Sequence, residues 1–278
     1  MKDKKVKAKL IQIPILMLQI LLAFLILVPV VWLLISSFKA DTEIISYPPT
    51  FFPRELTLKN YEKCSQRIDI FQYTKNSIIF AFGTIIPSLF VNTLAGYAFA
   101  RFEFKGKNVI FIIFLATMMI PFQVIMIPQF IQIHMMGMYD NYWGLIIPKI
   151  ASAYWIFMIR SAFTALPKEL EEAARIDGMN EFGIYARIML PLIRPALITM
   201  VILSINGSWN DLLWPLIITS SSKMRTLANG LAMFVGVNTI EYGAAFAGAS
   251  YSLIPMLVLY IFGQKYFIEG QITSGLKG

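Results

Sequence analysis

The segment EEAARIDGMNEFGIYARIMLP, Glu171–Pro191, is a charged stretch with helix-start and helix-stop signals, and it lies between two apolar runs. Its first acidic residues suit the start of a helix, because carboxylates favour the positive end of the helix dipole. Pro167 suits the first helical position, where its missing N–H costs nothing. Gly178 can adopt the left-handed conformation that ends helices. This pattern predicts a short helix over about 167–177.

A second helix is predicted directly after this one. Asn180 can cap it with a side-chain oxygen, and Glu181 falls in its first turn. This helix continues into the next apolar run, so the whole segment 166–191 is predicted to be a helix–turn–helix at one face of the membrane.

Small residues occupy the middle of the first predicted helix, and charged residues border them. Ala173 and Ala174 would let a second surface approach the backbone closely. Glu171, Glu172 and Arg175 could pair with charges on that surface. The segment therefore fits a docking element for a partner. An interfacial helix lying on lipid headgroups is the alternative that the residues alone leave open.

The composition of the whole chain indicates a protein that crosses the membrane several times. Hydrophobic residues make up 57% of it and charged residues only 14%, against about a quarter in soluble domains. The net charge of +8 does not indicate a nucleic-acid partner, because the basic residues are not gathered with aromatic residues on one patch. The single cysteine, Cys64, and the single histidine, His134, argue against an internal disulfide and a His-rich metal site.

Apolar runs long enough to cross a bilayer predict an all-α fold with six transmembrane helices. They lie near 11–36, 75–100, 108–133, 143–165, 187–218 and 246–268. The first run is too long for the apolar part of a signal peptide, so it is expected to be retained. The basic residues between the runs place both termini and segment 166–191 in the cytoplasm by the positive-inside rule.

Motifs for phosphate binding and hydrolysis are missing from this sequence. It contains no Walker A, HExxH or GxSxG pattern. We therefore expect neither ATP binding through a P-loop nor catalysis by this chain, and energy for transport would have to come from another subunit.

The charged segment resembles the EAA motif of binding-protein-dependent ABC importer permeases. The matching residues and their spacing are Glu172-Ala173-Ala174, three residues, Gly178, nine residues, then Ile188-x-Leu190-Pro191. In that family the motif is the coupling helix, which sits in a cleft of the cytoplasmic ATPase. The resemblance thus implies an ATPase-coupling role, carried here by Glu171, Glu172, Ala173, Ala174, Arg175, Asp177, Gly178, Ile188, Leu190 and Pro191.

Three other stretches resemble the maltose-type sugar permeases. Residues 76–108 look like the start of their membrane core, and GSWNDLLWPL, 207–216, looks like their fifth-span signature. The tail GQKYFIEGQITSGLKG, 263–278, is similar to the C-terminus of the shorter, MalG-like subunit. The sequence is accordingly identified as a member of this carbohydrate-importer permease family.

The resemblance implies a fold, a location and a set of partners. The fold would be the type I ABC importer (MetI-like) permease, a single transmembrane domain over 1–278 in the plasma membrane of a prokaryote. Its partners would be a second homologous permease subunit, a cytoplasmic ABC ATPase dimer, an extracytoplasmic solute-binding protein, the sugar and the lipid bilayer, with no nucleic acid. ATP and Mg²⁺ would be bound by the ATPase, and this chain would hold no cofactor or metal.

Polar and aromatic residues in the fifth run are the candidates for a substrate pathway or gate: Asn206, Trp209, Asn210, Asp211 and Trp214. Sugar sites combine hydrogen-bonding groups with aromatic faces, and an acid within a membrane span usually faces a cavity or a partner. The alternative is that these side chains bond to neighbouring helices or anchor the chain at an interface.

Three other functions are alternatives on the sequence. An ABC permease for another solute, such as an amino acid, polyamine or phosphate, would share the EAA motif. An ion-coupled secondary transporter is disfavoured, because such a protein would need no docking segment and usually carries several buried ionisable residues. A membrane-embedded enzyme is disfavoured by the lack of a catalytic cluster.

Overall fold

The computed structural model describes residues 2–235 and 241–275, and the side chains of 14–235 and 241–264. All elements of regular secondary structure in the described ranges are helices, as predicted. The chain forms two compact units, one of residues 1–69 with 231–254 and one of residues 70–230 with 255–278. The predicted domain 1–278 therefore contains two units, which are taken separately below.

The first unit contains the N-terminal helix and the segment that follows it. Its elements are α1 (Lys2–Ser36), α2 (Asp41–Ile44), α3 (Lys59–Arg67), η3 (Ala232–Phe234) and the first part of α15 (Tyr242–Gly275). Asn60 on α3 is buried, and its amide donates to the carbonyls of Ser37 and Lys39 at 2.9 and 2.6 Å. The backbone N–H of Gly243 donates to Asp41. These bonds join the residues after α1 to α3, and the start of α2 to α15.

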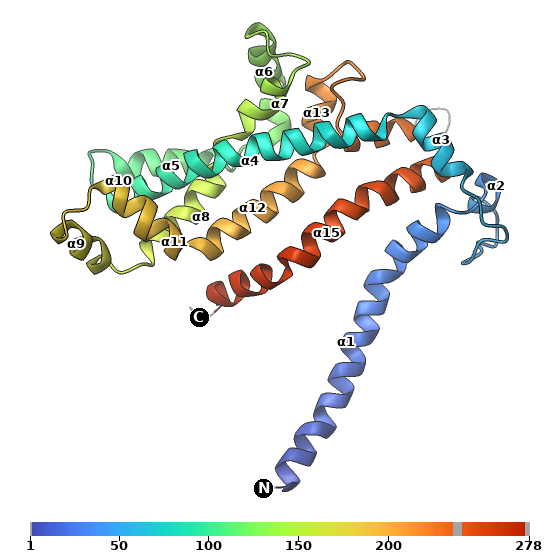
Figure 1. Cartoon of the computed structure of the whole chain (residues 1–278), viewed down its shortest axis with the longest axis horizontal. Coiled ribbons are helices and arrows are strands. Elements are labelled where there is room, and N and C mark those ends of the chain that lie inside the picture. The colour runs from blue at the N-terminus through green and yellow to red at the C-terminus, as the bar shows by residue number, and fades with distance from the viewer. Residues whose placement is uncertain (1, 236–240, 276–278) are drawn as a thin grey trace. The chain divides into compact units, whose positions relative to one another are not determined.

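The second unit is built around α4 (Ile70–Arg101), which packs lengthwise against α8 (Ala153–Thr164) and α12 (Arg194–Trp209) (Figure 1). At Gly96 on α4, an added Cβ would lie 2.6 Å from the side chain of Ile159 on α8, so glycine allows the two helices to approach closely. Tyr97, Phe163 and Met189 belong to the apolar core of this unit.

The remaining helices of the second unit are shorter. They are α5 (Lys107–Thr117), α6 (Phe122–Met135), α7 (Tyr142–Ile146), η1 (Ile147–Lys149), α9 (Glu169–Ile176), α10 (Glu181–Ile184), η2 (Tyr185–Met189), α11 (Leu190–Leu192), α13 (Leu213–Ile218) and α14 (Leu227–Leu231, whose last residue belongs to the first unit).

Three helices in the described chain are long and apolar enough to cross a membrane: Pro14–Ser36 of α1, α4, and Tyr242–Gln264 of α15. They coincide with the first, second and sixth predicted spans. The other three predicted spans correspond to bent helix pairs, so six crossings result if each pair is one span. The cytoplasmic location of the two chain termini stays a prediction. The last residues of the C-terminal tail, 276–278, lie outside the described residues.

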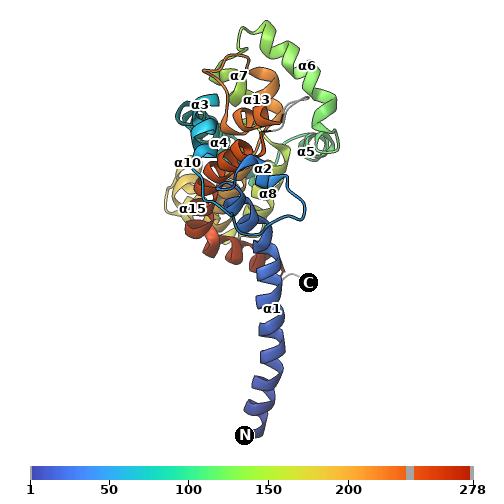
Figure 2. The ribbon, with the colours of Figure 1, turned by 90° about the vertical axis from the view of Figure 1, so that its right-hand side faces the viewer.

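Each of the three predicted spans 108–133, 143–165 and 187–218 is bent at a break between helices. The first is bent by 99° between α5 and α6 (Figure 2), where Pro121 lacks the N–H to continue the helix. The second is bent by 44° between η1 and α8, and the third by 76° between Leu192 and Arg194, just before Pro195. Residues 210–212 interrupt the third run again before α13.

Candidate coupling segment and polar cavity

The helix–turn–helix predicted at 166–191 is present at the end of the second unit where α4 and α8 finish (Figure 1). The first helix, α9, starts at Glu169, so Pro167 lies before it rather than at its first position. Gly178 has φ +80°, the left-handed conformation expected after the helix. The Asn180 side chain accepts a bond from the Gly183 N–H at 2.7 Å and caps α10, as predicted.

A buried ion pair fastens α9 to the end of α4. Arg101 Nε lies 2.7 Å from Glu171 Oε1, and the two side chains are 3% and 4% exposed. The N–H does not point at this oxygen, so the contact is ionic rather than a directed hydrogen bond. Arg101 also donates to the carbonyl of Leu166 at 2.8 Å. Glu171 is therefore engaged inside the unit, and the expectation that its charge borders an open docking surface was wrong.

A second ion pair closes the turn between α9 and α10. Arg175 donates to both carboxylate oxygens of Glu181, at 2.6 and 3.1 Å. These hydrogen bonds raise the pKa of Arg175 and lower the pKa of Glu181. Arg175 also lies 3.8 Å from Glu171, so it links the exposed turn to the buried pair. Asp177 is the C-cap residue directly after α9 and is exposed.

The two alanines of the segment have different surroundings. Ala174 is 4% exposed and belongs to the core with Ile184 and Met189, whereas Ala173 is exposed. Glu172 is also exposed, and the apolar side chain of Ile176 is 87% exposed. The face of α9 that is open to a partner therefore includes Glu172, Ala173 and Ile176. Ile176 was not among the predicted residues, although its position in the motif could have revealed it.

The end of the segment joins α4 through a π-helical turn, η2. The hydroxyl of Tyr185 in this turn lies 2.7 Å from Thr93 Oγ1 on α4. Ile188 and Leu190 pack against the core, while Pro191 is exposed at the start of α11. Turns of this kind often occur at functional positions, because they redirect the chain within a helix.

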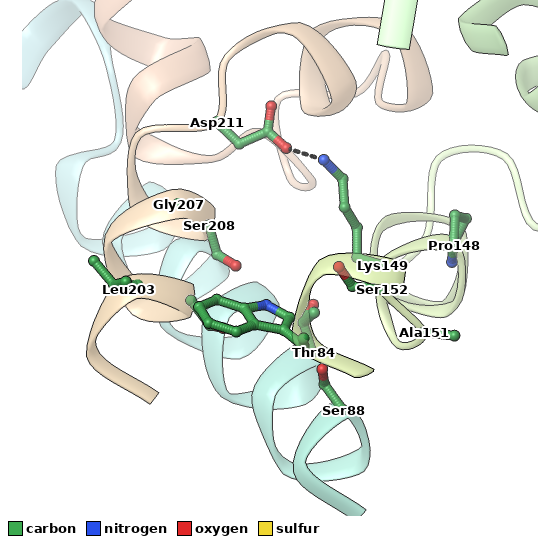
Figure 3. A pocket seen from close by; sticks show the side chains of 12 residues that line it. Thr84, Ser88, Pro148, Lys149, Ala151, Ser152, Leu203, Gly207, Ser208 and Asp211 are labelled. Atoms are coloured by element: carbon green, nitrogen blue, oxygen red, sulfur yellow. Dashed lines mark hydrogen bonds and ion pairs between the residues drawn. The ribbon is translucent and has the colours of Figure 1, made fainter. Parts of the chain in front are cut away.

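A polar cavity of about 480 Å³ lies within the second unit, between α4, the start of α8 and the end of α12 (Figure 3). Such a volume falls in the range of small-molecule sites, roughly 300–1,000 Å³. The residues that line it are Thr84, Ser88, Pro148, Lys149, Ala151, Ser152, Trp155, Leu203, Ser204, Gly207, Ser208 and Asp211.

An ion pair lies at one edge of the cavity. Lys149 Nζ is 2.7 Å from Asp211 Oδ2 (Figure 3). Both residues lie at breaks in the helices, because Lys149 ends η1 and Asp211 follows α12. The ammonium group also lies 5.2 Å from the centre of the Phe122 ring. Sequence reasoning missed Lys149, although a lysine inside an apolar run is itself a signal for a partner acid.

The five predicted pathway residues separate in the structure. Asp211 lines the cavity. Trp214 is fully buried, and its indole N–H donates to the Gly144 carbonyl at 3.2 Å, so it bonds to a neighbouring helix as the alternative reading proposed.

The other three predicted pathway residues do not line this cavity. Trp209 is buried, and Asn206 and Asn210 are exposed and bonded to each other at 2.9 Å. The structure thus brings one of the five, Asp211, to the cavity, together with Ser208 from the same stretch.

The sequence of residues 92–267 matches the family described as "binding-protein-dependent transport system inner membrane component". This match contains the coupling segment and most of the residues around the cavity. The chain belongs to this family.

Relatives within the family align with nearly the whole chain. The arabinooligosaccharides transport system permease protein AraQ of Bacillus subtilis is 36% identical over 261 residues, which cover 93% of each chain. The trehalose/maltose transport system permease protein MalG of Thermococcus litoralis is 33% identical, over 93% of this chain and 94% of its own. The diacetylchitobiose uptake system permease protein NgcG of Streptomyces coelicolor is 32% identical, over 93% and 86%.

Solved structures support the fold. A chain of a bacterial ABC transporter involved in the import of the acidic polysaccharide alginate superposes with a TM-score of 0.81, at 23% identity, over 93% of this chain and 97% of its own. A chain of the MetNI methionine ABC transporter gives a TM-score of 0.54, at 15% identity, over 75% and 98%. This permease therefore has the type I ABC importer (MetI-like) fold.

Proposed function

We propose that this permease carries a sugar or oligosaccharide into the cytoplasm as a membrane subunit of an ABC importer. The observation that carries the proposal is the alignment of more than 90% of the chain with permeases named for arabinooligosaccharides, trehalose/maltose and diacetylchitobiose. The polar cavity between α4, α8 and α12 supports it, because a transported polar solute needs hydrogen-bonding groups within the membrane.

The energy for transport would enter through α9. Its open face of Glu172, Ala173 and Ile176 would sit in the ATPase, while the buried Arg101–Glu171 pair transmits the movement to α4. Thr84 of the same helix lines the cavity, so α4 connects the docking segment to the solute pathway as one continuous helix. Displacement of α9 would thereby change the shape of the cavity, as alternating access requires.

The working transporter would contain several other subunits. We expect a second, homologous permease, an ABC ATPase dimer that binds ATP and Mg²⁺, and an extracytoplasmic solute-binding protein. This chain would contribute no catalytic group. The family and its apolar helices indicate a multi-pass membrane protein, and we place it in the plasma membrane of a prokaryote.

A decisive experiment is to isolate the tagged chain gently from its native membrane and identify the copurifying proteins by mass spectrometry. The isolated complex, with the solute-binding protein, is then reconstituted in liposomes and tested for uptake of labelled maltotriose, arabinotriose and diacetylchitobiose. A second permease, a P-loop ATPase and ATP-dependent sugar uptake are expected.

Other results would support the alternatives. Uptake of an amino acid, polyamine or phosphate in place of the sugars would point to an ABC permease for another solute. Transport by the isolated chain without ATP would point to a secondary transporter.

A further inference from the structure

Two hydroxyl groups at the cavity have no hydrogen-bond partner within the described chain: Thr84 Oγ1 on α4 and Ser204 Oγ on α12. Both atoms are buried, and Thr84 as a residue is only 6% exposed. A buried hydroxyl without a partner destabilises the protein, because no hydrogen bond replaces the bonds to water that it loses. Helical threonines and serines usually avoid this by bonding to a carbonyl one turn earlier, as Thr199 of α12 does. Both residues line the cavity, so a rotation about χ1 would present either hydroxyl to a ligand there without breaking a hydrogen bond.

The position of the cavity in the fold also favours a solute site. Thr84 is close to the middle of α4, which is 32 residues long and passes the criteria for a membrane span. Ser152 lies at the bend between η1 and α8, and Asp211 lies at the break after α12. Transporters place solutes near the bilayer midplane, where interrupted helices expose backbone and side-chain polar groups.

The charges at the cavity cancel. Among its lining residues Lys149 and Asp211 are the two charged ones, and they are paired at 2.7 Å. An anionic ligand would have to compete with Asp211 for Lys149, and a cationic ligand would have to compete with Lys149. An uncharged ligand can instead use the spare N–H groups of Lys149 and the remaining lone pairs of Asp211 without breaking the pair.

From these observations we propose that this cavity binds one uncharged sugar unit of the transported carbohydrate. The hydroxyls of Thr84 and Ser204 would bond to sugar hydroxyls, which both donate and accept, and the Lys149–Asp211 pair would bond to another. Trp155, which also lines the cavity, would supply an aromatic surface for the apolar face of the ring. The inference rests on the proposed import of sugar and deepens it, because it gives this subunit its own sugar contacts and selects uncharged sugars.

The test uses the intact transporter in nanodiscs and the double variant Thr84→Val with Ser204→Ala. Equilibrium binding of labelled maltotriose, arabinotriose and diacetylchitobiose is measured, with trigalacturonate as the acidic probe. We expect wild type to bind a neutral probe more tightly than trigalacturonate. The double variant should weaken neutral binding about tenfold, because two hydrogen bonds to the sugar are lost.

Matched controls separate binding from folding. The control variant Thr199→Val with Ser161→Ala also removes one threonine and one serine hydroxyl, from α12 and α8. Each of these hydroxyls donates to a carbonyl of its own helix, so the control should leave sugar binding unchanged. The double variant at the cavity should melt at the wild-type temperature or above it, because removing a buried hydroxyl without a partner breaks no hydrogen bond. In addition, Asp211→Asn leaves Lys149 unpaired and should raise the affinity for trigalacturonate.

Three results would overturn the inference: unchanged neutral binding in the double variant, tighter binding of trigalacturonate by wild type, or no binding of any neutral probe that the complex imports. In each case sugar import itself could still be measured in proteoliposomes. A wild-type complex that imports sugar while the cavity variants behave like wild type would leave the proposed function standing. A complex that imports no sugar would remove both.

Discussion

At the scale of the residue, the Arg101–Glu171 pair is the contact that determines where α9 can be. Its two side chains come from α4 and α9, far apart in the chain, and both are almost completely buried. A buried ion pair adds little net stability compared with apolar residues, but the loss of one partner is costly because the other charge stays buried. The pair therefore specifies the position of the docking segment more than it strengthens the fold.

This contact gives the first prediction. Glu171→Met should lower the free energy of local opening of α9 by roughly 3 kcal/mol, since it leaves Arg101 buried and unpaired. Hydrogen exchange of the α9 amides, measured by mass spectrometry, should then become about 100-fold faster. The double variant Arg101→Met with Glu171→Met should restore most of the protection. Equal exchange rates in wild type and Glu171→Met would show that the pair does not hold α9.

The open face of α9 gives the second prediction. Ile176→Asp should prevent assembly with the ATPase, because it puts a charge where an exposed apolar side chain would enter the partner. The protein should still reach the membrane in normal amounts, since Ile176 makes little contact within its own unit. Copurification of the ATPase with the tagged variant provides the measurement.

Leu56→Asp is the control for this prediction, because it changes another highly exposed apolar residue, in the loop between α2 and α3. It should keep the ATPase bound. Loss of the ATPase with both variants would mean that Ile176 has no special role. Ala174 is a poorer position for such a test, because it is part of the core and Ala174→Asp would damage folding first.

At the scale of the element, the turn between α9 and α10 depends on one backbone conformation. Gly178 has φ +80°, and a Cβ at this position would meet no atom within 4 Å. A side chain there would cause backbone strain of roughly 1–2 kcal/mol without a collision. The turn is also closed by Arg175 and Glu181 and capped by Asn180, so strain in it would change the angle between the two helices.

The third prediction follows from this turn. Gly178→Val should strongly reduce ATP-driven uptake in proteoliposomes while the chain remains in the membrane, because α9 would be reoriented relative to α10. Gly137→Val is a matched control: Gly137 also has a positive φ, +67°, and open space around it, but it lies between α6 and α7. Equal losses of uptake with both variants would indicate general instability in place of a defect in coupling.

At the scale of the whole molecule, the sidedness of the membrane crossing is the main expectation from charge patterning. The coupling segment should face the cytoplasm, and the loop that contains α2 and α3 should face outward. Cys64 on α3 is the single cysteine, is fully buried, and has a pKa raised by burial to about 11. It should therefore be almost unreactive at neutral pH, because the thiolate is the reactive form.

The fourth prediction uses this unreactive background. In intact spheroplasts, a membrane-impermeant maleimide should label Leu56→Cys but neither Ile176→Cys nor the wild type. Ile176→Cys should be labelled after the membrane is opened and the ATPase is removed, because residue 176 is highly exposed in this chain by itself. Labelling of Ile176→Cys in unopened spheroplasts would reverse the predicted orientation. Rapid labelling of wild type would contradict the burial of Cys64.

Much of the coupling segment could be predicted from local signals alone. A left-handed conformation at Gly178 and a capping bond from Asn180 are confirmed, because both depend on a few neighbouring residues. The start of α9 was misplaced by about two residues, which is usual for helix ends. The assignment of Glu171 to an open surface was wrong, because the charge of a helix residue does not reveal which face is covered by another helix.

The candidate pathway was predicted less completely, for a related reason. Asp211 was found because an acid within an apolar run is unusual. Trp214 has an aromatic ring of the kind that stacks on sugars, yet it is buried and its indole N–H donates to the Gly144 carbonyl on α7. Thr84 and Ser204 carry no local signal, since their significance comes from the absence of a helical partner and from their shared position at the cavity.

The sequence by itself determined the membrane class, the helical content, the approximate spans and the coupling motif, because composition, apolar run length and helix-end signals are local properties. Only the tertiary structure decided which runs are bent, which face of α9 is open, and that Lys149, Asp211, Thr84 and Ser204 surround one cavity. These features depend on contacts between residues that are distant in the chain, such as Lys149 with Asp211. The physical reason is that side chains become buried and charges become paired only when separate helices pack together.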